Sequence, residues 1–155
     1  MSVQPQGLET DIAGLAAHAG THLGYSEWRT MEQDEVDRFA DLTHDHNWIH
    51  VDRERAKSGP FGGTIAHGYL TLALLAPLML ELLRVEGAST VINYGLNRVR
   101  FPAPLPVGAR YRAGLELAAV EEIAGGVQAQ LNATVEVEGA GKPSLVAECL
   151  VRYYA

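Results

Sequence analysis

Cysteine is almost absent from this sequence, and its scarcity excludes an intrachain disulfide. Cys149 is the one cysteine among 155 residues, so it has no partner within the chain. It stands in an alternating strand pattern, where a buried and inert thiol is expected. A cytoplasmic protein is consistent with this, and the first residues lack the basic and apolar segments of a signal peptide.

Positive charge is also scarce. The chain has 12 Lys and Arg against 19 Asp and Glu, which gives a net charge of -7, and no basic run stands out. Nucleic acids and anionic membranes are therefore not expected as partners. A small anionic ligand is still compatible, because a few local arginines are enough to hold one.

No apolar segment has the length and purity of a membrane span. The best candidate, from Tyr69 to Val85, is short for a span and contains Pro77, Glu81 and Arg84. It is apolar on almost every side. We therefore expect a core helix from His67 to about Val85, kinked at Pro77, that protein covers all round.

The remaining composition is that of an ordinary globular protein, with 47% hydrophobic and 20% charged residues. We expect one domain over residues 1–155, with a loose terminus at residues 1–7. Before the core helix, hydrophobic spacing and capping residues predict a helix at about 8–18, a strand at 22–30, a helix from Thr30 to about Thr43, and a helical turn at 52–56.

After the core helix, apolar residues alternate with period two. Four long strands are expected, at 91–101, around 110–117, at 127–138 and at 145–153. Consecutive strands joined by tight turns favour an antiparallel sheet. Together with the apolar helix they predict an α+β hotdog fold, in which the sheet wraps around the helix. One sheet cannot cover such a helix on every side, so we expect a homodimer with two-fold symmetry.

A dense polar cluster separates the helix that ends near Thr43 from the core helix. Its key members are Asp45 and His50, because a carboxylate and an imidazole that share one water can act as a general acid–base pair. Asn47 lies between them and can bond the backbone as easily as a substrate. On spacing alone, a polar loop with an Asx turn and a solvated histidine is the favoured interpretation, because Asp and His are common in loops.

A metal site is the rival interpretation of the same cluster. His44, His46 and His50, with Asp45, offer enough nitrogen and oxygen donors for zinc or iron. The interpretation is less favoured, because His67 is the one further ligand candidate downstream. We expect no metal.

Gly68 stands at the predicted N-terminus of the core helix. Free backbone N–H groups and the positive end of the helix dipole stabilise an oxyanion there, and glycine allows close approach. Relief of crowding at the helix start is the plainer explanation, and both can hold. Arg98 and Arg100 share one strand face, where they are either solvated or placed to meet the phosphates of a ligand.

The sequence from Thr43 to Asp52 resembles the signature of MaoC-like, (R)-specific enoyl-CoA hydratases, which runs Gly-Asp-x-Asn-Pro-aliphatic-His-x-Asp/Glu. The matching residues are Asp45, Asn47, Ile49, His50 and Asp52. Ala66-His-Gly68 is similar to the His-Gly at the head of the family's central helix, and residues 97–108 resemble its following strand and turn. The His-Asp-His-x-Trp-Ile-His variant is most similar to the single-domain actinobacterial NodN-like type.

Two residues depart from the signature. His44 stands where the pattern has glycine, and Trp48 stands where it has proline. Both lie beside the acid–base pair, so they bear on substrate range more than on chemistry. Some relatives carry a serine on the central helix that touches the substrate region, and by register Ala76 occupies that position here.

The resemblance implies a reaction and its residues. Asp45 and His50 would activate one water that adds to C3 of a trans-2-enoyl-CoA, giving a (3R)-3-hydroxyacyl-CoA. The N–H of Gly68 would hold the thioester oxygen as it becomes enolate-like. CoA would be the carrier of the substrate, with no metal or redox cofactor required. Further substrate contacts are expected from Asn47, Trp48, His67, Asn97, Arg98 and Arg100.

Three other functions stay open from the sequence. A hotdog acyl-CoA thioesterase needs a similar acidic residue and helix end. A non-catalytic acyl-CoA or signal-lipid binding module would not need the Asp45/His50 pair. The third is a metalloenzyme built on the histidines.

Overall fold

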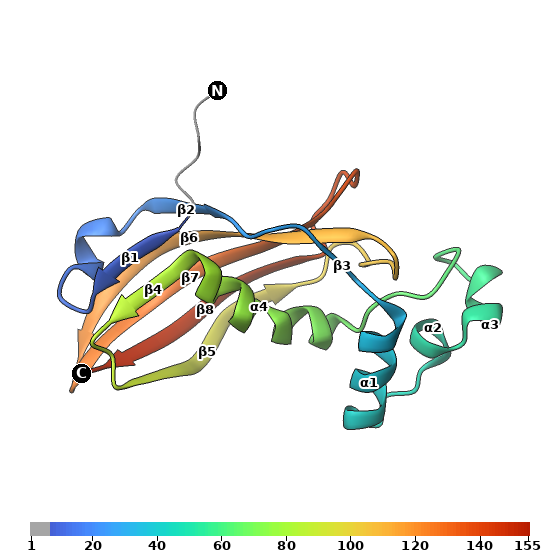
Figure 1. Cartoon of the computed structure of the whole chain (residues 1–155), viewed down its shortest axis with the longest axis horizontal. Helices are drawn as coiled ribbons and strands as arrows, with labels where there is room; N and C mark the ends of the chain where they lie inside the picture. Colours follow the sequence, from blue (N-terminus) through green and yellow to red (C-terminus); the bar gives the residue numbers. More distant parts are fainter. Residues whose placement is uncertain (1–6) are drawn as a thin grey trace.

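The computed structural model describes residues 7–155, and its centre is a curved antiparallel sheet with one long helix, α4 (Gly68–Leu82), lying across it (Figure 1). The sheet has six strands in the order β2-β6-β7-β8-β5, and β3 also pairs with β6. This is the expected α+β hotdog arrangement. The strands are β2 (Thr21–Tyr25), β3 (Arg29–Thr30), β5 (Thr90–Arg100), β6 (Arg110–Ile123), β7 (Gly126–Val137) and β8 (Leu145–Tyr154).

The four predicted strands form because their sequences alternate, so that one face of each strand is apolar. In β7 the odd-numbered residues from Val127 to Val137 are all buried. The paired registers place Leu117 opposite Leu131, and Leu131 opposite Cys149. These inward residues form one core with the buried side of α4, which comprises Leu70, Leu75, Leu78 and Leu82.

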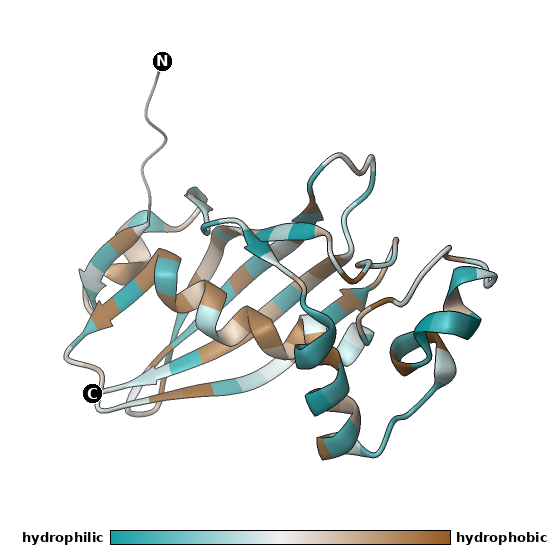
Figure 2. Cartoon of the chain, turned by 45° about the vertical axis from the view of Figure 1, so that its right-hand side comes forward, coloured by the Kyte–Doolittle hydropathy of each residue, from teal (hydrophilic) through white to brown (hydrophobic). Residues whose placement is uncertain are grey.

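The sheet of one chain leaves part of the core helix uncovered, as expected from the sequence. Tyr69 is 74% exposed and Leu80 is 62% exposed, although both lie in the apolar segment. The sheet covers one side of α4, and Figure 2 shows the largely apolar helix on the open side of the sheet. An apolar helix surface therefore stays uncovered by this chain.

The predicted helix at 8–18 is wrong. Residues 8–11 form strand β1 (Leu8–Asp11), which pairs in parallel with β4 (Leu83–Glu86), and a short 3-10 turn follows at Leu15–His18. Pairing with a distant strand overrides the local helical spacing. The same pairing ends α4 at Leu82, so the predicted end near Val85 falls inside β4.

The predicted strand at 22–30 is interrupted. Ser26 breaks it, because its hydroxyl accepts a hydrogen bond from the N–H of Ala113 while its own N–H donates to the carbonyl of Ala113. Helix α1 (Gln33–Thr43) then begins later than Thr30, with Glu32 and Glu35 forming the capping box. Its end at Thr43 agrees with the prediction.

Two short helices follow α1, namely α2 (Trp48–Val51) and α3 (Arg53–Lys57). Asp52 caps α3 as predicted, since its carboxylate accepts a hydrogen bond from the N–H of Arg55 at 3.1 Å. These helices project beyond the sheet next to α1 (Figure 1). They form the part of the chain that carries the polar cluster.

Within residues 7–155, no helix has the length and apolar character needed to cross a membrane. The cytoplasmic location stays a prediction. The expected loose terminus falls on residues outside the described part, apart from Gly7, whose N–H donates to the carbonyl of Leu23.

The packing of α4 gives a stability prediction. Leu78 is fully buried, so Leu78→Ala should lower the free energy of unfolding by about 2–5 kcal/mol through lost burial and a residual cavity. Leu42→Ala is the matched control, because Leu42 is 79% exposed on α1, and its effect should stay within about 0.5 kcal/mol. Urea unfolding measures both values. Equal effects of the two substitutions would contradict the assignment of Leu78 to the core.

Candidate active site

The polar cluster begins where α1 ends, at a residue with unusual backbone geometry. His44 has a φ of 64°, the only positive φ of a non-glycine residue among residues 7–155. This left-handed conformation ends the helix and turns the chain toward Asp45. The hydratase signature described above has glycine at this position. The backbone geometry explains that preference, because glycine adopts positive φ without strain. His44 is thus a helix terminator by position.

His50 is buried and held in one orientation. It lies in α2, its side chain is 7% exposed, and its Nδ1 lies 2.7 Å from the carbonyl oxygen of Ile65. A carbonyl only accepts, so Nδ1 carries the proton and Nε2 is left as a free base. Burial lowers the pKa of His50, and the bond to Ile65 opposes this in part. The ring is therefore disposed to accept a proton at Nε2.

Asp45 lies beside His50, as the sequence predicted. Its carboxylate is half exposed and accepts a hydrogen bond from the N–H of Asn47 at 3.3 Å, which is the Asx turn considered above. A carboxylate oxygen of Asp45 and ring nitrogens of His50 and His67 all lie within 4.8 Å of one another. One water can bridge two groups at that separation with normal hydrogen bonds. The solvated-histidine alternative fails, because His50 is buried.

His67 fixes the backbone of Asp45. Its Nε2 donates to the carbonyl oxygen of Asp45 at 3.0 Å, while the nearest carboxylate oxygen of Asp45 is 4.0 Å away. The ring stacks on His50 at 3.8 Å between centroids and contacts Phe39 on another side. His67 is 2% exposed, a position that favours holding Asp45. Its expected contact with substrate stays a prediction.

The arrangement of the imidazoles suits a metal ion poorly. The rings of His50 and His67 are stacked with only 25° between their planes, so their in-plane lone pairs do not converge on one point. Each ring also uses one nitrogen in a bond to a backbone carbonyl. His46 is engaged with Asp41 at 2.8 Å. The expectation that no metal is needed stays a prediction.

Gly68 begins α4, as expected, and the first turn has no side-chain cap. Its first N–H groups are therefore available to a ligand. A Cβ at Gly68 would lie only 3.1 Å from the ring of Phe101, so packing also favours glycine here. A hollow of about 330 Å³ borders Gly68, Thr71 and Phe101.

Asn47 and Trp48 have structural partners. The side chain of Asn47 caps α2 by accepting a hydrogen bond from the N–H of Ile49 at 3.4 Å. The Trp48 ring lies against Gly59, and the guanidinium of Arg55 lies 4.2 Å from its centroid. Both residues shape the loop around the pair. Their predicted contacts with substrate stay untested.

Asn97, Arg98 and Arg100 lie on the exposed edge strand β5. Arg98 and Arg100 line a hollow of about 310 Å³ together with Pro102. Pro102 also lines the hollow that contains Gly68. The two arginines are thus connected along the surface to the start of α4.

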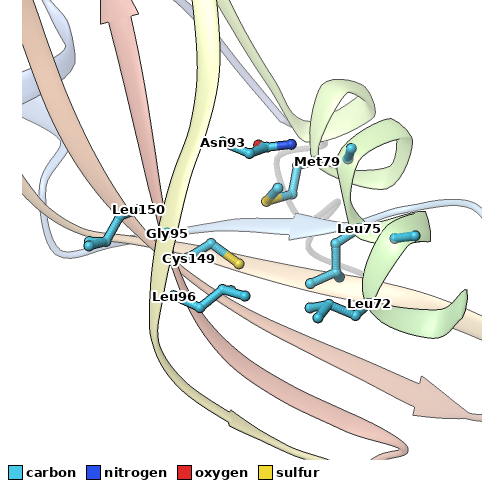
Figure 3. A pocket seen from close by; sticks show the side chains of 10 residues that line it. Leu72, Leu75, Met79, Asn93, Gly95, Leu96, Cys149 and Leu150 are labelled. Carbon is cyan, nitrogen blue, oxygen red and sulfur yellow. The ribbon is translucent and has the colours of Figure 1, made fainter. Parts of the chain in front are cut away.

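An apolar pocket of about 240 Å³ lies between α4 and the strands β5 and β8. Figure 3 shows the side chains of α4 facing those of the two strands across it. Ala76 is among the lining residues, and its expected correspondence to the serine of some relatives stays a prediction. Burial raises the pKa of the Cys149 thiol to about 11, which agrees with the expected inert thiol. The other lining residues include Leu72, Leu75, Met79, Asn93 and Leu96.

Two residues of the site were missed from the sequence. Gln33 and Thr64 are both buried. The Thr64 hydroxyl donates to the side-chain oxygen of Gln33, and the side-chain nitrogen of Gln33 donates to the backbone carbonyl of His50. Neither residue belongs to the signature from Thr43 to Asp52. No local pattern links them to His50, because they meet it only through the fold.

Comparison with known proteins places the chain in a family. The model of the MaoC like domain matches residues 15–139. The chain belongs to the MaoC-like family. It is 58% identical over 145 residues to 3-hydroxyacyl-thioester dehydratase Z of Mycobacterium tuberculosis, covering 93% of this chain and 96% of that protein. It is 42% identical over 142 residues to nodulation protein N of Rhizobium leguminosarum bv. viciae, covering 90% and 88%.

The solved structures agree with this assignment. The (R)-hydratase from A. caviae involved in PHA biosynthesis superposes with a TM-score of 0.71 at 27% identity, covering 86% of this chain and 94% of that chain. The hotdog fold and the predicted MaoC-like and NodN-like resemblance are confirmed. The protein is accordingly an enzyme of the hydratase and dehydratase type.

The buried imidazole predicts an acid-sensitive stability. The pKa of His50 is lower in the folded protein than in the unfolded chain, so below about pH 6.5 the unfolded chain binds the proton first. Neutral His50 therefore contributes fully to the folding stability above that pH. This contribution is lost as the pH falls through the pKa of His50 in the folded protein. His50→Asn places an amide near the imidazole Nδ1 and removes the titration. The stability of the native protein relative to this variant should therefore fall on acidification, because the pKa of His50 is lowered by burial.

Urea unfolding of both proteins at neutral and mildly acid pH measures this difference. His44→Asn is the control, because asparagine tolerates the left-handed backbone at that position and His44 is exposed. A stability difference between native protein and His50→Asn that stays constant with pH would contradict the assignment.

Proposed function

We propose that this MaoC-like protein hydrates trans-2-enoyl-CoA to (3R)-3-hydroxyacyl-CoA and catalyses the reverse dehydration. The observation that carries the proposal is the free Nε2 of buried His50 beside the carboxylate of Asp45, next to the uncapped start of α4. The name of the M. tuberculosis relative, a 3-hydroxyacyl-thioester dehydratase, supports it. So does the name of the A. caviae (R)-hydratase.

The pair handles the protons of one water. Held between the Asp45 carboxylate and the Nε2 of His50, the water loses a proton to the pair as its oxygen adds to C3. The pair returns a proton to C2 on the same face. Water is thereby added across the double bond with no net change in the enzyme. His50 is suited to this exchange because burial keeps it neutral, with an unprotonated Nε2.

The start of α4 stabilises the charge that develops during addition. As the water attacks C3, negative charge moves onto the thioester oxygen. The backbone N–H of Gly68 donates to that oxygen, assisted by the positive end of the helix dipole. The missing side-chain cap leaves this donor available. No metal or redox cofactor is needed for this route.

The surrounding hollows accommodate the two ends of the substrate. The surface that connects Gly68 through Pro102 to Arg98 and Arg100 is assigned to the carrier, whose phosphates would meet the two guanidinium groups. The apolar pocket along α4 is assigned to the acyl chain. The CoA carrier and these contacts are part of the proposal.

The enzyme is further proposed to act as a homodimer. Six large apolar side chains are exposed on α4 and on β5, an edge strand of the sheet. Exposed apolar side chains gathered on two neighbouring elements favour a protein interface, and an unpaired edge strand is open to a second strand. A second copy would cover both. The six side chains are Tyr69, Leu80, Val91, Ile92, Tyr94 and Leu96.

Substitution of the pair tests the chemistry. Asp45→Asn and His50→Asn should each lower kcat for hydration of crotonyl-CoA by at least about a hundredfold, because each removes a proton-transfer group. Loss of the enoyl absorbance measures the rate. Folding of both variants should be retained, as judged by circular dichroism.

Two neighbouring substitutions serve as matched controls. Asp41→Asn removes an exposed carboxylate near the end of α1, and His44→Asn removes an exposed imidazole. Both should keep near-normal turnover. Near-normal turnover in Asp45→Asn or His50→Asn would instead overturn the acid–base assignment. Release of free thiol, with the double bond of the acyl product retained, would favour a thioesterase.

Charged substitutions among the exposed apolar side chains of α4 and β5 test the proposed dimer. Ile92→Glu on β5 and Leu80→Glu on α4 should convert a dimer of the 16.7 kDa chain into monomers, because a buried unpaired carboxylate is costly. Sedimentation velocity measures the mass. Leu42→Glu, on an exposed apolar residue of α1, should leave the dimer intact. A monomeric native protein would refute the dimer.

A further inference from the structure

Gln33 lies in the first turn of α1 and has no part in the proton transfers described above. It is nevertheless almost completely buried, with 5% of its surface exposed. A buried carboxamide is costly unless each polar group finds a partner. Its partners therefore indicate what it does.

All the hydrogen-bonding groups of this side chain are used. Its Nε2 donates to the carbonyl oxygen of His50 at 2.8 Å and to a carboxylate oxygen of Asp37 at 2.9 Å. Its Oε1 accepts a hydrogen bond from the hydroxyl of Thr64 at 2.6 Å. Gln33 thus joins α1 to α2 and to the segment just before α4.

These contacts close a ring of bonds around His50. Thr64 precedes Ile65, whose carbonyl holds the Nδ1–H of His50 at 2.7 Å. The N–H of Ile65 donates to the carbonyl of Ile49, the residue before His50. Gln33 holds the His50 backbone with one end of its amide and Thr64 with the other. It therefore sets the spacing between the imidazole and the carbonyl that orients it.

We propose that Gln33 is a positioning residue that, with Thr64, fixes the orientation of the His50 imidazole for catalysis. The inference rests on the proposed function of His50 as half of the acid–base pair. It assigns Gln33 no contact with substrate. The amide acts by keeping the Nε2 lone pair of His50 directed at the water shared with Asp45.

The test compares two isosteric substitutions. Gln33→Met keeps length and removes both polar ends, while Thr64→Val keeps shape and removes the hydroxyl. Each should lower kcat, with Gln33→Met losing roughly tenfold to a hundredfold and KM changing little. The double variant should lose less than the product of the two single losses, because both act through one ring of bonds. Gln130→Met is the control, since the side chain of Gln130 donates to Asn132 on β7, away from His50.

A readout independent of turnover accompanies the kinetics. Imidazole NMR of the native protein should show a slowly exchanging Nδ1–H on His50, and both variants should lose that protection. The titration midpoint of His50 should rise, because burial is the main cause of its lowered pKa and a released ring is hydrated. The titratable groups beside it are His67 and Asp45, while Asp37 reaches it through Gln33.

The following results would overturn the proposal. If both variants only lower the melting temperature, while kcat, the Nδ1–H signal and the His50 midpoint stay as in the native protein, Gln33 is merely structural. Thr64→Val keeps the test decisive should Gln33→Met fail to fold. A native protein without hydration activity would defeat the proposed function, whereas the NMR comparison would still decide whether Gln33 holds His50.

Discussion

The hydrogen bond from His50 Nδ1 to the carbonyl of Ile65 is the contact on which the site depends. It settles the tautomer of the imidazole and leaves Nε2 as the one nitrogen that can work as a base. It also ties α2 to the segment that leads directly into α4. The proposed acid–base pair and the proposed oxyanion site are therefore held at a fixed spacing, although they come from separate elements.

The rest of the fold holds that segment in place. The sheet curves around α4, and the buried leucines of the helix fix its start relative to β6 and β8. His67, the last residue before the helix, clamps the backbone of Asp45 while stacking on His50. This apolar core is closely packed, so it keeps α4 in one position. The polar residues next to the start of α4 are held in place with it.

Much of the fold was predictable, because its signals are local. Alternation revealed the four long strands, and the apolar segment revealed α4. The helix at 8–18 was wrong because β1 pairs with β4, which follows α4 far along the chain, and no local spacing reports such a partner. The uncovered side of α4 was foreseeable from its composition, because the helix is apolar almost all round and the sheet of one chain reaches only one side of it.

The residues of the site were likewise only partly predictable from the sequence. Asp45, His50 and Gly68 were identified from a compact signature, and the fold brings them together. Gln33 and Thr64 carry no signature, since their partners lie 17 and 31 residues away in sequence. The sequence predicts that the change from glycine to histidine at His44 affects substrate range. The structure shows instead that the position has a positive backbone φ. Side-chain identity alone does not report a dihedral angle.

The configuration of the product tests the central claim most directly. Crotonyl-CoA is incubated with the enzyme, and the 3-hydroxybutyryl-CoA formed is resolved by chiral chromatography. One water delivered by Asp45 and His50 to a single face predicts the (3R) product alone. A (3S) or racemic product would contradict the account, and so would free CoA appearing in place of the hydroxyacyl thioester.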